Sequence, residues 1–171
     1  MGSFEQTPEY KQSLRMRPAC DRVLQWVFGC GNNINRFEKE GGHILDTKFH
    51  IDLELKLASG ATITGQEKAL SNKFYKYRTL TMEYHQNRAT GEEGEFFKIA
   101  SQFYLSGYSD KTGERFAEWK VFDVLKLHQW LASSNGSNIP KARLAGGSRA
   151  SFLPIPYDSI PPDCCIASAK Q

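Results

Sequence analysis

Residues 51–68, IDLELKLASGATITGQEK, are the segment that indicates the fold most clearly. Apolar residues occupy every second position from Ile51 to Leu57, with charged residues between them. Side chains alternate across a strand, so this run has one apolar face and one charged face. Ser59 and Gly60 then supply a turn, and 61–68 returns as a second strand. We therefore predict an antiparallel hairpin.

The end of this hairpin carries the first functional signal. Gln66 and Lys68 are two positions apart and share a face, whereas Glu67 points to the opposite face. Pairing of the strands can bring Asp52, Gln66 and Lys68 together on one face. A carboxylate, an amide oxygen and an amine suit a divalent-metal site beside a lysine. The same alternation also fits an ordinary antiparallel sheet with one side in water.

Composition bounds the class of protein. At 171 residues the chain can form one domain with its own core, and 40% hydrophobic and 24% charged residues are typical of a soluble globular protein. It has no apolar run of membrane-spanning length and no signal-peptide core, so we predict a cytoplasmic protein without a membrane partner. The net charge of +3 permits nucleic-acid binding without requiring it. The four cysteines lack metal-site spacing, so free thiols are expected.

The chain divides into four segments by composition. Residues 1–18 are polar and are expected to be a flexible N-terminal segment, and residues 19–132 are expected to hold the core. Residues 133–150 read as a basic loop rich in Gly and Ser. Residues 151–171 read as an extended tail packed on the core, where prolines restrict any strand to a sheet edge.

Within the core, apolar periodicity predicts a mixed α+β domain. A helix is expected over 20–29 with Asp21 as its cap, and another helix begins after Asp123. Alternating or apolar runs predict further strands at 79–84, 103–108 and 116–122.

A helix followed by a hairpin, with Asp52 on one strand and Gln66-Glu67-Lys68 on the next, resembles the PD-(D/E)XK nuclease superfamily. The segments TLTMEYHQN, GEFFKIASQFYLSGYSD and WKVFDVLKLHQWL are similar to phage and microbial nucleases of this type. The resemblance implies a restriction endonuclease-like αβββαβ core, a central mixed sheet flanked by helices. Gln66 stands where the superfamily usually has Asp or Glu, and Ile51 stands where a proline is usual.

The resemblance also implies roles for individual residues. Asp52, Gln66 and Lys68 would be catalytic, with Glu83 as a further acidic group on the next strand. Asp52 and Gln66 would hold Mg²⁺ or Mn²⁺, with Glu54 as a further candidate ligand. A competing register also exists, because Glu54-Leu55-Lys56 is itself an acidic-x-Lys tripeptide with Asp46 upstream. We prefer Gln66 because Asp46 and Glu54 are too close in sequence for two strands and a turn.

Two cation-rich segments are candidates for contacting nucleic acid. The first follows Lys68 directly and interleaves cations with aromatic residues; the second lies in the basic loop. Cations reach phosphates and aromatic rings stack on bases, although packed aromatic residues would give the same pattern. The candidate cations are Lys73, Lys76, Arg78, Lys141, Arg143 and Arg149.

The function expected from the sequence is therefore a Mg²⁺-dependent endonuclease with DNA as its partner, as a monomer or a homodimer. Two alternatives remain. The first is a nucleic-acid-binding protein of the same fold with weak or no catalysis, which the presence of Gln66 in place of an acidic residue favours. The second is a partner-binding α+β domain in which the hairpin is only an exposed sheet.

Overall fold

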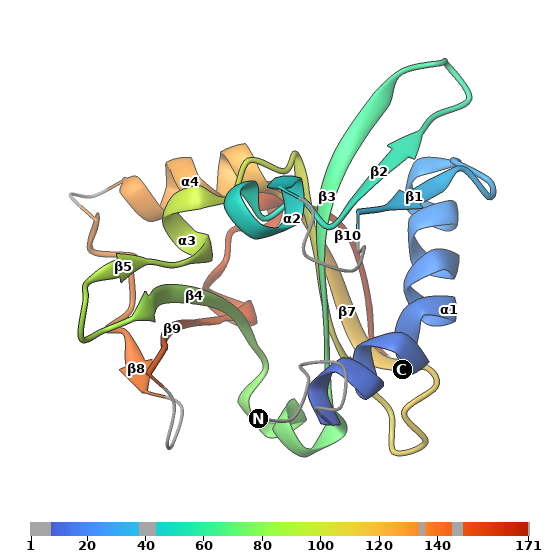
Figure 1. Cartoon of the computed structure of the whole chain (residues 1–171). Coiled ribbons are helices and arrows are strands. Elements are labelled where there is room, and N and C mark those ends of the chain that lie inside the picture. The colour runs from blue at the N-terminus through green and yellow to red at the C-terminus, as the bar shows by residue number, and fades with distance from the viewer. Residues whose placement is uncertain (1–7, 38–43, 134–135, 145–148, 171) are drawn as a thin grey trace.

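The computed structural model describes residues 8–37, 44–133, 136–144 and 149–170. The chain is a mixed α+β protein with few helices and two sheets (Figure 1). None of the helices in these ranges is long and apolar enough to cross a membrane. All four cysteines are free thiols, as expected.

The larger sheet, sheet A, has six strands in the order β1-β2-β3-β6-β7-β10. β3 and β6 are parallel, and the other neighbouring strands of this sheet are antiparallel. The bounds of its strands are β1 Ile34–Arg36, β2 Leu53–Lys56, β3 Thr62–Leu70, β6 Phe103–Ser109, β7 Phe116–Asp123 and β10 Cys165–Lys170.

The smaller sheet, sheet B, has four antiparallel strands in the order β5-β4-β9-β8. Its bounds are β4 Thr79–Asn87, β5 Glu92–Glu93, β8 Arg143–Leu144 and β9 Ser151–Pro156. The helices are α1 Pro8–Phe28, α2 Ile44–Phe49, α3 Glu95–Lys98 and α4 Val124–Ala132, with short 3-10 helices η2 Asn72–Tyr77, η4 Tyr157–Ser159 and η5 Pro162–Cys164.

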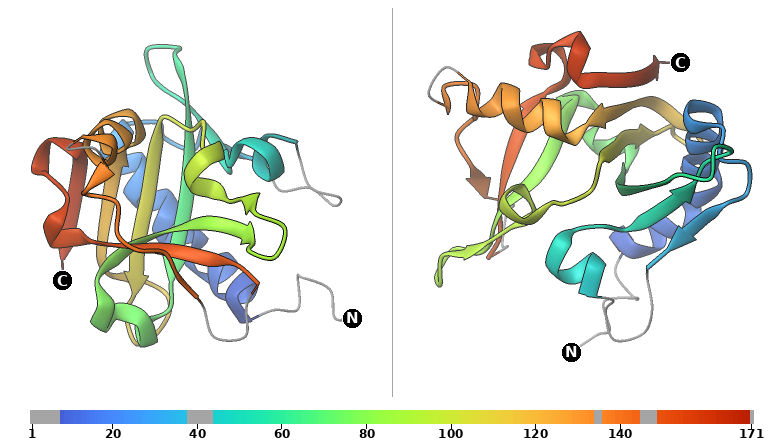
Figure 2. Two further views of the ribbon diagram at one scale, coloured as in Figure 1. Left: turned by 90° about the vertical axis from the view of Figure 1, so that its left-hand side faces the viewer. Right: turned by 90° about the horizontal axis from the view of Figure 1, so that it is seen from above.

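Sheet A is the middle layer of the molecule. Helix α1 covers one face, where Leu53, Leu55 and Phe103 join the α1 side chains in one core cluster. Sheet B and α4 lie on the other face, and a second cluster forms there around Tyr104, Tyr108 and residues of β4 and β9 (Figures 1 and 2). Because both faces are covered, all seven residues of β6 are buried. The resemblance implied a central mixed sheet flanked by helices; the mixed sheet is present, but a second sheet covers one of its faces together with α4.

The predicted strands are confirmed, with small shifts at their ends. The hairpin pairs Leu53 with Gly65 and Lys56 with Thr62. Asp123 caps α4 as predicted, because its carboxylate accepts the Lys126 N–H at 3.0 Å.

The N-terminal helix differs from its prediction. It begins at Pro8, so residues 8–18 are helical where a flexible segment was expected; residues 1–7 lie outside the described ranges. Asp21 is therefore in the helix interior and cannot be its cap. Polar composition and Pro18 concealed this helix, because a proline inside a helix is disfavoured and its first turns carry few apolar residues.

The expectation for 151–171 is partly right. Ser151–Pro156 forms β9 between β4 and β8, so it is not an edge strand along its whole length. However, β8 pairs only with Ser151 and Phe152, so Pro154 and Pro156 lie beyond it and pair on the β4 side alone. The rest of this segment forms β10, which pairs with β7 at the edge of sheet A.

Candidate active site

The candidate site lies where the two strands of the hairpin separate. β2 pairs with β3 only from Thr62 to Gly65, whereas β3 continues to Leu70 beside β6. Asp52 stands at the point of separation. Its N–H donates to the Gly65 carbonyl at 2.9 Å, and its carboxylate Oδ2 accepts the Glu67 N–H at 2.9 Å. A side-chain carboxylate thus replaces the missing strand partner and is fixed in position.

The Asp52 carboxylate is in an unfavourable place for a negative charge. Burial raises its pKa well above the usual range, and the neighbouring carboxylates of Glu67, Asp46 and Glu95 raise it further. The hydrogen bond from the Glu67 N–H acts in the opposite direction. A buried carboxylate beside other carboxylates is an arrangement that a bound cation would stabilise.

Lys68 projects from β3 towards sheet B and α3. Its Nζ donates to the Thr81 carbonyl at 2.9 Å and lies 3.5 Å from Glu95 Oε2. About a quarter of the side chain, 28%, remains exposed. An ammonium group has three N–H donors, so one donor remains for a substrate or a water molecule.

Glu95, the first residue of α3, is the site residue that the sequence analysis missed. Its side chain is 4% exposed. Oε2 accepts the Glu83 N–H at 3.2 Å, whereas the buried Oε1 has no hydrogen-bond partner. Gly94 allows this approach, because a Cβ there would lie 2.6 Å from the Glu83 carbonyl oxygen. The sequence signal was only a glycine followed by an acidic residue at a helix start, which is common.

Gln66 Oε1 and Tyr104 Oη are two more buried oxygens at this place. Gln66 Oε1 has no hydrogen-bond partner, whereas Tyr104 Oη is close enough to the Glu95 carboxylate to interact with it. The residues are adjacent, since Gln66 pairs with Tyr104 across β3 and β6. Burial raises the pKa of Tyr104, and the Glu95 and Asp52 carboxylates raise it further. Asp52, Gln66, Lys68, Glu95 and Tyr104 therefore share the face of sheet A that meets sheet B.

Glu83 and His50 lie at the border of this group. Burial raises the pKa of Glu83; the charge of Lys68 lowers it and that of Glu95 raises it. Burial lowers the pKa of His50, against the effect of Glu95. The His50 Nε2 is buried without a partner, and its backbone has a left-handed φ of 47°. Both side chains are close enough to respond to the central charges.

Glu67 faces the other way, as its position in the strand predicts. It forms two hydrogen bonds with Arg36, at 2.9 and 3.0 Å, and Arg36 also bonds Asp21 on α1 at 2.7 Å. These side chains tie β1, β3 and α1 together. Glu67 is therefore a structural residue, and the catalytic candidates lie on the opposite face.

The structure does not bring Glu54 into the group. Glu54 accepts a hydrogen bond from Asn35 Nδ2 at 3.0 Å on β1, and Lys56 is exposed on the same strand β2. Asp46 lies in α2, where it is near enough to raise the pKa of Asp52. The competing register needs two strands between Asp46 and Lys56, and the structure has a helix and one strand there.

The candidate nucleic-acid-binding cations are in different situations. Arg78, with a left-handed φ of 44°, forms two 2.8 Å hydrogen bonds with Glu118 and one with Asp158, so it ties sheet A to η4. In η2, the Lys73 and Lys76 ammonium groups lie over neighbouring aromatic rings, 4.7 and 5.0 Å from the centroids. Lys141, Arg143 and Arg149 are exposed, and residues 145–148 of that loop lie outside the described ranges.

The donor set fits a hard divalent cation in part. Within the described ranges, no group of three or more His, Cys, Asp or Glu side chains could hold a metal ion. Magnesium keeps several waters and needs only one or two carboxylates. Two carboxylates, Asp52 and Glu95, and the unpartnered oxygen of Gln66 supply oxygen ligands of that kind.

No family model, no curated protein and no solved structure matches this chain. Its function therefore has to be inferred from the geometry of the site.

Proposed function

We propose that this protein is a divalent-metal-dependent endonuclease that hydrolyses DNA phosphodiester bonds. The observation that carries the proposal is the position of Lys68. Its ammonium group lies 3.5 Å from the buried Glu95 carboxylate, on the face that also carries Asp52. Two acidic groups and a lysine at the separation of two strands are the groups that metal-assisted phosphodiester hydrolysis uses.

The order of the elements supports the same proposal. Helix α1, strands β1, β2 and β3, helix α3 and strand β6 occur in the order αβββαβ, with α2 inserted between β1 and β2, and η2, β4 and β5 inserted before α3. In sheet A the first three strands are antiparallel neighbours, and β6 lies parallel to β3. This is the order that the resemblance to PD-(D/E)XK nucleases implied, although α3 has only four residues.

Each residue has a distinct role in the proposed reaction. Asp52, Gln66 and Glu95 would hold Mg²⁺ or Mn²⁺, which when bound lowers the pKa of water and offsets charge on the phosphate. Lys68 binds the phosphate or orients the attacking water, using the donor not taken by Thr81 and Glu95. Glu83 and Tyr104 lie beside these groups and contribute to the electrostatic environment of the site.

A cavity lies beside the first cation-rich segment, between α1 and the end of β3. It has a volume of about 350 Å³, and its lining includes Gln12 and Ser13 of α1, Glu67, Lys68 and Lys73. Because α1 and Glu67 are on the face of sheet A opposite to the Lys68 ammonium group, this cavity is not the entrance to the candidate site. Because Arg78 is occupied by Glu118 and Asp158, we assign phosphate contact in this segment to Lys73 and Lys76 and a structural role to Arg78.

One observation favours a second function, a nucleic-acid-binding protein of the same fold without catalysis. The second position of the motif is Gln66, a weaker ligand than a carboxylate, and Lys68 is already engaged by Thr81 and Glu95. The two functions differ in one measurable property, which is turnover.

The test is cleavage of plasmid DNA with Mg²⁺ or Mn²⁺. We expect the native protein to cut DNA and a chelator to stop it. Lys68→Ala and Asp52→Asn should lower the rate by about a hundredfold or more, because positioned acid–base and ligand groups contribute at least that much. The matched controls Lys126→Ala and Asp163→Asn, both exposed and on other elements, should cut at the native rate.

Each outcome decides between the candidates. DNA binding without cleavage under any divalent cation would favour the inactive binding protein. Cleavage at the native rate by both site variants would show that the active site lies elsewhere.

A further inference from the structure

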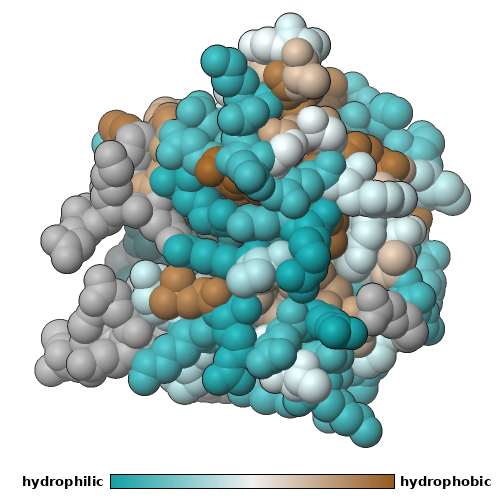
Figure 3. Space-filling model, turned by 90° about the vertical axis from the view of Figure 1, so that its right-hand side faces the viewer, coloured by the Kyte–Doolittle hydropathy of each residue, from teal (hydrophilic) through white to brown (hydrophobic). Residues whose placement is uncertain are grey.

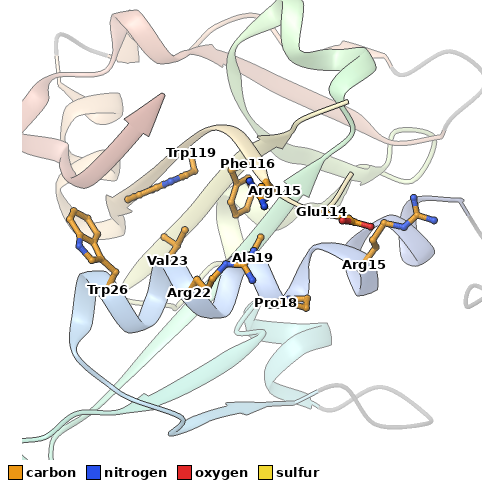
Figure 4. A pocket seen from close by; sticks show the side chains of 10 residues that line it. All are labelled: Arg15, Pro18, Ala19, Arg22, Val23, Trp26, Glu114, Arg115, Phe116 and Trp119. Carbon is orange, nitrogen blue, oxygen red and sulfur yellow. The ribbon is translucent and has the colours of Figure 1, made fainter. Parts of the chain in front are cut away.

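A pocket on the other face of sheet A combines cations with aromatic rings. It lies between α1 and the start of β7 and has a volume of about 760 Å³ (Figure 4). Its lining includes three arginines and three aromatic side chains, Arg15, Arg22, Arg115, Trp26, Phe116 and Trp119. The side of the molecule that carries α1 is mainly hydrophilic with separate apolar patches (Figure 3). The pocket is therefore distinct from the candidate active site.

Trp26 is the unusual residue of this pocket. Its side chain is 72% exposed, whereas Trp119 is 8% exposed. The two rings meet edge to face, with centroids 5.9 Å apart and an angle of 74°. Trp119 thus supports Trp26 from the β7 side while most of the Trp26 indole stays in contact with water. A supported, exposed indole is well suited to stack on a flat ring.

The arginines of the pocket are available for an anion. Among the described residues, no carboxylate lies within ion-pair distance of Arg15, Arg22 or Arg115. Arg36 and Arg78, in contrast, are both bound to carboxylates. One acidic side chain, Glu114, also lines the pocket, which leaves an excess of positive charge. Guanidinium groups match the geometry of phosphate oxygens.

The spacing along α1 indicates an extended ligand. Arg15, Arg22 and Trp26 are seven and four residues apart, so they lie along one face of the helix. At 1.5 Å per residue the row is about 16 Å long. A row of cations that ends at a ring fits a chain of phosphates carrying bases better than it fits one small anion.

We propose that this pocket binds single-stranded nucleic acid, with a base stacked on Trp26 and phosphates held by Arg15, Arg22 and Arg115. A free nucleotide has the same chemistry on a smaller scale and fills only the Trp26 end of the row. The inference does not depend on the proposed nuclease activity, since the two sites lie on opposite faces of sheet A.

The test measures binding of a labelled oligothymidylate of about ten nucleotides by fluorescence anisotropy, beside quenching of the native tryptophan fluorescence. Trp26→Ala should weaken binding about tenfold or more. Arg22→Gln should weaken it severalfold and reduce the dependence on salt by about one ion. Lys126→Gln on α4, which removes the same charge, should leave both readouts unchanged. Circular dichroism checks that Trp26→Ala remains folded.

Several results would overturn the inference. These are an oligonucleotide that does not quench tryptophan fluorescence, native affinity in Trp26→Ala, or a loss of affinity in Lys126→Gln as large as in Arg22→Gln. Deoxythymidine monophosphate that binds as tightly as the oligonucleotide, or a duplex that does, would overturn the single strand as the occupant.

Discussion

Asp52 is the residue on which the site depends most. It directly precedes β2, at the point where β2 and β3 separate, and its carboxylate accepts the Glu67 N–H. The carboxylates of Glu67, Asp46 and Glu95 are close enough to raise its pKa. Burial raises its pKa in the folded protein, whereas the unfolded chain has the ordinary value of about 3.9. Above that ordinary value the folded state therefore keeps a proton that the unfolded state has lost. The free energy of unfolding therefore falls as the pH rises from the ordinary carboxyl pKa to the raised pKa of folded Asp52, and above that it no longer changes through this group.

This sign gives a testable result for Asp52→Asn. The amide keeps an oxygen to accept the Glu67 N–H but carries no charge, so we expect a higher free energy of unfolding at neutral pH than in the native protein. The advantage should shrink as the pH falls towards the ordinary carboxyl pKa, where both proteins are neutral at this position. Urea denaturation without divalent cations, at a series of pH values, measures this difference in the free energy of unfolding.

Asp163→Asn serves as the control, since Asp163 is exposed in η5. Equal free energies of unfolding for Asp52→Asn and the native protein at every pH would mean that folding does not raise the pKa of the Asp52 carboxyl group.

How much of the site could be foreseen depends on where each residue comes from. Strand alternation was enough to separate Lys68 from Glu67, and the ion pair of Glu67 with Arg36 agrees with that assignment. It could not find Glu95, because Glu95 reaches Lys68 from α3, far along the chain. It also could not separate Arg78 from Lys73, since only the folded chain brings Glu118 and Asp158 to Arg78.

Among the secondary-structure elements, the sequence predicts strands with clear apolar periodicity, but it does not predict which distant strands pair with them. The hairpin, β6, β7 and the Asp123 cap of α4 follow from local periodicity and capping. Sheet B was not foreseen, because β4 and β9 are separated by more than sixty residues, and no local pattern reports that pairing. The early start of α1 was missed because tertiary packing on β3 stabilises a helix whose own sequence is polar.

The placement of α3 against β4 depends on Gly94. A Cβ at this position would lie within 3 Å of the Glu83 main chain, which cannot give way as a side chain can. We expect Gly94→Ala to lower the free energy of unfolding by about 1–3 kcal/mol and to displace α3. The displacement would move Glu95 away from Lys68, so DNA cleavage should fall as well. Urea denaturation and the plasmid assay measure the two effects.

Glu95→Gln provides the comparison for this variant. It removes the charge while α3 stays in place, so cleavage should fall without the loss of stability expected for Gly94→Ala. If Gly94→Ala keeps native stability and native cleavage, the close approach of α3 and β4 is not what positions Glu95.

In the whole molecule, sheet A separates two surfaces with different chemistry. Sheet B lies on one face of sheet A and α1 on the other (Figure 1). The face covered by sheet B holds Lys68 and the buried carboxylates of Asp52 and Glu95, and the α1 face holds the arginine and tryptophan pocket (Figure 4). Side chains between two packed sheets are held rigidly, which is what the proposed active site requires. The exposed pocket needs no such support, because stacking and phosphate contacts tolerate variation.

The central claim is that Asp52, Gln66 and Glu95 hold a divalent cation beside Lys68. Diffraction from crystals soaked in Mn²⁺, collected where manganese scatters anomalously, tests it most directly. The account predicts an anomalous peak on the sheet B side of β3, coordinated by the Asp52 carboxylate and by oxygen of Gln66 or Glu95, and no such peak in Asp52→Asn. A native crystal with no manganese at Asp52, or with manganese bound only at other residues, would contradict it.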